Sequence, residues 1–184
     1  AQLEHSSWRG PWLHIGRLAA RHAEYGALEL KADLVAALDQ IVVQKLEVRG
    51  PGGLAAAGKL GLTAEQDTDL NLKWRELRWP LSGVAEYSSR EGEAELKGKG
   101  FENLRLKTSF ALGAQARIKV RAEWQDRKLD AAAQWTDLSW PLQDPAAEWL
   151  SPHGKANVRG DLEAYQWGLD ADLAARGTPV TLKA

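Results

Sequence analysis

The chain has 184 residues and a nearly balanced charge, with 24 Lys plus Arg against 25 Asp plus Glu. This balance argues against a nucleic-acid-binding domain, which would be clearly basic. The absence of Cys excludes a disulfide framework, a thiolate metal site and a thiol nucleophile. Nine Trp and 17 scattered Gly favour a β protein with frequent turns over a helical one.

The first part of the chain is the least regular. Residues Ala1–His5 do not form a signal peptide, so an export signal would have to lie outside this sequence. No run of about 18 apolar residues suits a membrane-spanning helix. Between Arg17 and Gln40 we expect at most one or two short helices, one starting near Leu18 and one at Leu34–Leu38. A further helical turn is considered at Pro145–Leu150.

Along most of the chain, apolar residues recur at every second position. This period predicts strands with one apolar and one charged face. Turn signals such as Gly50–Gly53 and Asp126–Lys128 separate the strands at intervals too short for βαβ crossovers, so they favour antiparallel meanders. The clearest alternating runs are Leu28–Leu34, Leu70–Trp74, Leu104–Leu112, Ala116–Trp124, Leu129–Trp135 and Tyr165–Leu173.

The second half of the chain contains an internal duplication. The segment Trp74–Leu81 (WRELRWPL) matches Trp135–Leu142 (WTDLSWPL) at an offset of 61 residues. With one inserted residue, the match continues from Gly92–Gly98 to Gly154–Gly160 as Gly-x-Ala-x-aliphatic-x-Gly. Repeats of this kind stack on their neighbours. We therefore predict one β segment over residues 1–184, with units at about 70–130 and 131–184, belonging to a longer array.

Within each Trp-x-x-Leu-x-Trp-Pro-Leu element, the parity of the apolar positions changes. Leu72 and Trp74 share one parity, whereas Leu77 and Trp79 have the other. A β-bulge or a sharp bend would return both sets to one face, and the proline of each element would end its strand.

These elements resemble the TamB family of AsmA-like envelope proteins, relatives of bridge-like lipid transfer proteins. The resemblance covers roughly residues 40–184 and depends on Leu46–Gly58, Leu70–Trp74, Leu77–Leu81 and Gly92–Gly98. It implies an all-β fold of repeated antiparallel strands curled into an open hydrophobic groove, a β-taco, with at most short helices. It also implies a periplasmic location, as part of an inner-membrane-anchored protein.

The resemblance further implies phospholipid acyl chains as the ligand, a TamA-like outer-membrane partner of the Omp85 class, and support of outer-membrane protein assembly. It brings no catalytic residue, cofactor or metal, so we expect a protein that is not an enzyme. An acyl chain gains roughly 0.8 kcal/mol per buried CH₂ without directional contacts, so a repeated apolar floor could hold it. The predicted groove residues are Leu70, Leu72, Trp74, Leu104, Leu106, Phe110, Ile118, Val120, Trp124, Leu129, Trp135, Trp167, Leu169 and Leu173.

Three alternatives stay open at this stage. Alternating strands also build closed β-sandwiches, which would make the chain an interaction module with no lipid role. A β-solenoid carbohydrate-active enzyme is the second. The third keeps the open sheet but changes the ligand, because an unfolded outer-membrane β-strand could pair at an exposed edge.

Other motifs carry little chemistry. Gly53–Lys59 imitates a phosphate-binding loop, but Leu60 occupies the position where that motif needs Ser or Thr. The four His residues lack metal-ligand spacing and are expected to be solvated. Glu91, Glu93 and Glu95 share one strand face with other charges, so we expect these carboxylates to be solvated as well.

Overall fold

The computed structural model describes residues 2–9, 12–22, 26–36, 40–49, 52–79, 87–142, 148–161, 163–175 and 178–183. Within these ranges the chain forms thirteen strands and no helix. The strands are β1 (Gln2–Arg9), β2 (Trp12–His22), β3 (Gly26–Ala36), β4 (Gln40–Arg49), β5 (Gly53–Gly61), β6 (Asp67–Trp79), β7 (Tyr87–Lys99), β8 (Asn103–Leu112), β9 (Ala116–Gln125), β10 (Lys128–Trp140), β11 (Trp149–Gly160), β12 (Tyr165–Ala175) and β13 (Thr178–Lys183).

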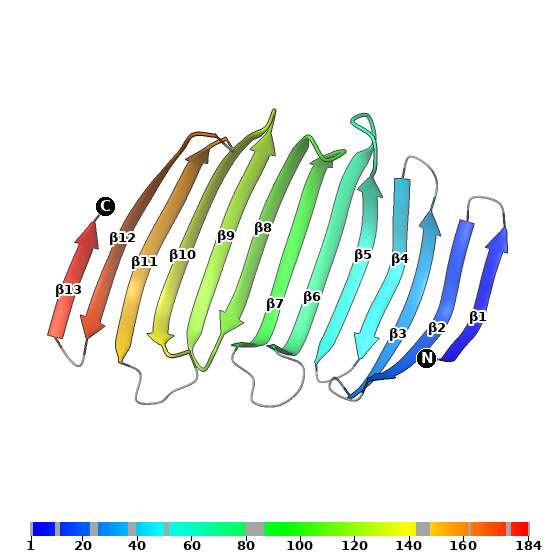
Figure 1. The fold of residues 1–184 in the computed structure, drawn as a ribbon, viewed down its shortest axis with the longest axis horizontal. Helices are drawn as coiled ribbons and strands as arrows, with labels where there is room; N and C mark the ends of the chain where they lie inside the picture. Colours follow the sequence, from blue (N-terminus) through cyan, green and yellow to red (C-terminus); the bar gives the residue numbers. More distant parts are fainter. Residues whose placement is uncertain are drawn as a thin grey trace.

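The thirteen strands form one antiparallel sheet in which each strand pairs with its neighbours in the sequence. Figure 1 shows them side by side in chain order, with the two termini at opposite edges of the sheet. The first and last strands do not pair with each other, so the sheet is open. The prediction of an all-β fold with an open antiparallel sheet is confirmed. The described strands contain no second sheet, which a closed sandwich would require.

The helices expected between Arg17 and Gln40 are wrong wherever the structure describes this region. Leu18 lies in β2 and Leu34 in β3, and each of these strands pairs on both edges. Leu and Ala favour helices, but this preference is weak beside ladder hydrogen bonds on two sides. The turn considered at Pro145–Leu150 falls partly outside the described residues, and its last two residues begin β11.

The parity change in each Trp element is made by one residue with a left-handed backbone. Glu76 and Asp137 occupy equivalent positions, with φ of 51° and 54°. The register of β6 on β7, and of β10 on β11, is the same before and after this residue. No residue is inserted, so the predicted change of face is a backbone bend and not a bulge.

The bend also limits how far β6 and β10 pair with the strand that precedes each of them. β6 pairs with β5 only up to Arg75, and β10 pairs with β9 only up to Thr136. The remaining residues of β6 and β10 pair with the following strand alone. β10 ends at Trp140, directly before Pro141, as predicted, whereas Pro80 lies outside the described residues.

In the part of the chain that the structure describes, no helix has the length and apolar content needed to cross a bilayer.

Candidate functional site

The register of the sheet aligns the apolar positions of successive strands into rows that run across the strands. Row A extends from β4 to β12, and each of its members pairs with the next. It consists of Val48, Leu54, Trp74, Gly92, Phe110, Ile118, Trp135, Gly154 and Ala171.

Three further rows lie parallel to row A on the same face, at two-residue intervals along the strands, except on β4, where a register shift separates Val43 from Leu46 by three residues. None of their positions carries a charged side chain. Row B is Leu46, Ala56, Leu72, Ala94, Thr108, Val120, Ala133, Ala156 and Leu169; row C is Val43, Gly58, Leu70, Leu96, Leu106, Ala122, Ala131, Val158 and Trp167; row D is Thr68, Gly98, Leu104, Trp124, Leu129, Gly160 and Tyr165. We call rows A to D together the apolar face.

Thirteen of the fourteen residues predicted to line a groove belong to these four rows. The exception is Leu173, which lies two residues beyond row A on β12 and therefore on the same face. All fourteen residues thus share one side of the sheet, although they come from strands spread over about 100 residues of sequence.

The side chains of the apolar face have no second layer of described protein above them. Of the fourteen predicted residues, thirteen are half-buried and Trp167 is 60 % exposed. Among the described residues, no large side chain is less than 2 % exposed. A sandwich core would bury several such side chains completely. The buried apolar residues of the described part are instead four alanines and one leucine, namely Ala56, Ala111, Ala116, Ala171 and Leu142.

A repeated contact fixes the two largest side chains of row A. The indole N–H of Trp74 donates to the hydroxyl of Ser89 at 2.8 Å, and Trp135 donates to Ser151 at the same distance. Each serine hydroxyl in turn donates to the backbone carbonyl two residues later, at 3.3 Å. The bend described above returns these serines to the apolar face, where they satisfy the indole without leaving a free polar group.

Each of these tryptophans lies over a glycine of the next strand. A Cβ on Gly92 would lie 2.2 Å from Cζ2 of Trp74, and one on Gly154 would lie 2.1 Å from Cζ2 of Trp135. The two glycines therefore permit a close approach that no other residue allows. We call Trp74–Ser89–Gly92 and Trp135–Ser151–Gly154 the Trp–Ser–Gly motifs.

The hydroxyl groups of the two threonines on the apolar face, Thr68 and Thr108, are also satisfied by the backbone. The Thr108 hydroxyl donates to the carbonyl of Glu93 at 2.7 Å. Thr68, which is 2 % exposed, accepts from the N–H of Gly61 at 3.1 Å and donates to the carbonyl of Gly100 at 3.4 Å. An apolar ligand lying on this face would therefore meet little unsatisfied polarity.

The opposite side of the sheet, the charged face, carries exposed ion pairs. Arg117 lies 3.6 Å from Glu91, and Lys97 hydrogen-bonds Glu95 at 2.5 Å. The hydrogen bond and charge of Lys97 lower the pKa of Glu95, and the carboxylate raises the pKa of Lys97. Such exposed pairs contribute little to stability. Glu91 and Glu93 are exposed, as expected, whereas Glu95 is half-buried.

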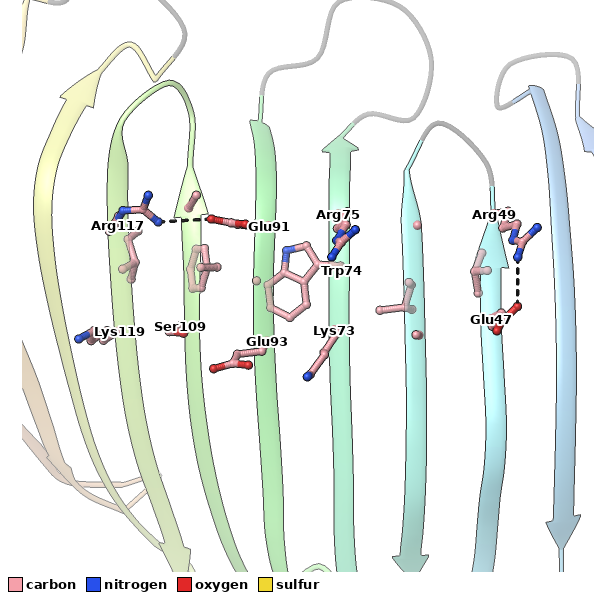
Figure 2. A pocket seen from close by; sticks show the side chains of 18 residues that line it. Glu47, Arg49, Lys73, Trp74, Arg75, Glu91, Glu93, Ser109, Arg117 and Lys119 are labelled. Atoms are coloured by element: carbon pink, nitrogen blue, oxygen red, sulfur yellow. Dashed lines mark ion pairs between the residues drawn. The ribbon is translucent and has the colours of Figure 1, made fainter.

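A hollow of about 630 Å³ lies across β4 to β9 (Figure 2). Its lining consists of row A residues and the residues directly before and after them on each strand, most of which are charged. It includes no residue of row B. Because alternate residues point to opposite faces, this hollow opens on the charged face, with the row A backbone as its floor. Figure 2 shows the charged side chains around it, among them Lys73, Arg75, Glu91, Glu93 and Arg117.

Two further hollows of this type involve β9 to β12 and β5 to β9, with volumes of about 510 and 680 Å³. Six of the fourteen predicted residues help to line these three hollows, namely Trp74, Leu104, Phe110, Ile118, Trp124 and Trp135. The sequence interpretation treated the charged positions as simply solvated, so it missed these hollows. Alternating charge indicates a solvated face but gives no sign of which charges become neighbours.

Within the described ranges, no group of three His, Asp or Glu side chains is placed to hold a metal ion. Comparisons of the chain with protein-family models, with curated proteins and with solved structures found no match. A function therefore has to be argued from the two faces of the sheet.

Proposed function

We propose that this chain is a periplasmic segment of a TamB-like protein, and that its apolar face shields phospholipid acyl chains during transport from the inner to the outer membrane. In this proposal the parent protein is anchored in the inner membrane. It works with a TamA-like protein of the Omp85 class and supports outer-membrane protein assembly.

The observation that carries the proposal is the size of the uncovered apolar face. Rows A to C span about 13 Å along the strands and about 38 Å across the nine strands from β4 to β12, and row D adds a strip of about 7 Å over the seven strands from β6 to β12. The resulting area of about 700 Å² exceeds the roughly 300–600 Å² typical of the largest apolar patch on a soluble monomer. A surface of this extent calls for an apolar occupant.

The chemistry of the face suits a chain that moves along it. The rows offer apolar contact at every strand but no charged group, and the hydroxyls of Thr68 and Thr108 are engaged by the backbone. Each CH₂ removed from water contributes roughly 0.8 kcal/mol wherever it lies. A hydrocarbon chain would therefore be held by the whole row and not by one site, which permits sliding.

The test compares two adjacent residues of β9 that point to opposite faces. Val120 belongs to row B and is half-buried, whereas Arg121 is exposed on the charged face. The purified wild-type chain should carry phospholipid detectable by mass spectrometry and should bind a fluorescent phosphatidylethanolamine. Val120→Glu should weaken this binding measurably, because it places a charge on the apolar face. Arg121→Glu, the matched control, should keep it.

Far-UV circular dichroism would verify that both variants retain the sheet. A wild-type chain that binds no lipid, or equal binding by two folded variants, would refute the proposal. Ile118→Glu in row A and Leu169→Glu in row B extend the test to other strands.

A second candidate ligand is an unfolded outer-membrane β-strand. In the described sheet β2 to β12 each pair on both sides, so such a strand would add at an edge of the sheet by β-augmentation. Binding of a barrel-strand peptide that is unaffected by Val120→Glu would favour this ligand over an acyl chain.

A further inference from the structure

The charged face contains a second hollow with a distinct composition. It has a volume of about 510 Å³ and lies over β9 to β12, on the side of the sheet opposite to the apolar rows. We call it the cationic hollow. Its polar lining consists of Arg117, Lys119, Gln134, Thr136, His153, Lys155, Asp170 and Asp172.

The register places these side chains as two parallel clamps. Gln134 of β10 pairs with Lys119 on one side and with Lys155 on the other. Two residues further along the strand, Thr136 pairs with Arg117 and His153 in the same way. The basic residues of each clamp stand two strand spacings apart, about 10 Å between backbones, with a neutral hydrogen-bonding residue between them.

Carboxylates are absent from the middle of this region. On β8 to β11, the two clamp rows contain no described carboxylate. The neighbouring row of the charged face, which runs through Lys107 and Arg121, contains none either, and the three rows together hold five cations. Lys107 and Arg121 stand directly opposite each other, an arrangement of like charges that costs stability. The five cations are Lys107, Arg117, Lys119, Arg121 and Lys155.

Acidic partners are found only at the two edges of the region. Lys155 pairs with Asp170 at 3.1 Å on one edge, and Arg117 lies 3.6 Å from Glu91 on the other. Among the described residues, Lys119 has no carboxylate within 4.0 Å. The hollow is therefore cationic over β9 and β11, neutral over β10, and acidic only at its β12 wall.

We propose that the cationic hollow binds the phosphate group of a phosphate diester. Lys and Arg supply charge-assisted donors, and the Gln134 amide and the Thr136 hydroxyl supply neutral donors beneath them. The carboxylate of Asp170 already engages Lys155 at 3.1 Å and opposes further negative charge, so a singly charged diester suits the hollow better than a doubly charged monoester. Because the sheet is one layer thick, this phosphate is not the headgroup of a lipid whose tails cover the apolar rows beneath it.

The experiment titrates the labelled 184-residue chain with glycerophosphoglycerol, a soluble phosphate diester, and follows backbone amide resonances by NMR. Shifts should cluster on β9 to β11. The double variant Lys119→Gln/Lys155→Gln should bind about tenfold more weakly, the loss expected from removing two exposed charged contacts. Lys128→Gln serves as the matched control, because it removes a cation from β10 outside the hollow, and it should bind like the wild type.

A parallel arm measures cosedimentation with phosphatidylglycerol vesicles, which present the same diester on a membrane. Loss of either binding in the double variant, but not in the control, supports the proposal and identifies the source of the phosphate. Binding of neither probe by the wild-type chain, or equal binding by the double variant and the control, overturns it. Uptake of fluorescent lipid by the apolar face should be the same in all these variants, so the two proposals can fail separately.

Discussion

Replacing Gly154 by Ala adds a methyl group against the indole of Trp135. We expect this to break the hydrogen bond from the indole N–H to the hydroxyl of Ser151. The new Cβ would lie 2.1 Å from Cζ2 of Trp135, so the indole would have to move. Overpacking of this kind typically costs about 1–3 kcal/mol. An indole displaced in this way no longer reaches the Ser151 hydroxyl, which it contacts at 2.8 Å.

Replacing Ser151 by Ala removes the same hydrogen bond by a different route. Ser151 is 5 % exposed, so the indole N–H of Trp135 loses its acceptor in a site with little access to water. The expected cost is about 1–3 kcal/mol. Because Gly154→Ala already breaks this bond, Ser151→Ala should add little to it. The double variant should fall short of the sum of the single effects by about 1–2 kcal/mol.

Urea unfolding followed by far-UV circular dichroism measures the free energy of unfolding of each variant. The indole N–H resonance of Trp135 in NMR spectra reports directly whether its hydrogen bond survives. The second Trp–Ser–Gly motif supplies the control, since Gly92 and Ser151 lie about four strand spacings apart, roughly 19 Å. Gly92→Ala combined with Ser151→Ala should be additive to within about 0.5 kcal/mol.

Simple additivity of Gly154→Ala and Ser151→Ala would refute this reasoning. So would an unshifted Trp135 indole resonance in Gly154→Ala, because it would mean that the ring accommodates the methyl group without leaving Ser151.

Two further predictions concern the hairpin turn and the charged face. Arg127 has a φ of 65° in the two-residue turn between β9 and β10, so Arg127→Gly should raise stability in urea by about 0.5–1 kcal/mol, and Arg127→Ala should bring no gain. The lowered pKa of Glu95 stabilises the fold above the ordinary value of 4.5, and this contribution is lost as the pH falls through the lowered pKa. Lys97→Gln should therefore move the Glu95 titration, followed by carboxyl NMR, back toward that value and weaken the acid dependence; an unchanged titration would contradict the assigned cause.

Much of the fold was predictable because a period of two fixes local geometry. Ile118 and Val120 alternate with Lys119 and Arg121, and the structure places the two pairs on opposite faces of β9. The helices expected near Leu18 and Leu34 were wrong because helix propensity is local, whereas pairing with two neighbouring strands is not. The bend at Glu76 was predicted only as a change of parity; nothing in the sequence chose a left-handed residue over a bulge.

Residue type and alternation are enough to specify which side chains are apolar and which of them share a strand face. The register in which neighbouring strands pair follows only from the three-dimensional structure. Register aligned Trp135 with Gly154, and it brought Lys119 and Lys155 to either side of Gln134. The structure also shows that the sheet stays open, so that no layer of described residues covers the apolar face. Strand pairing depends on turn geometry and on contacts between distant residues, and alternation within one strand does not encode these.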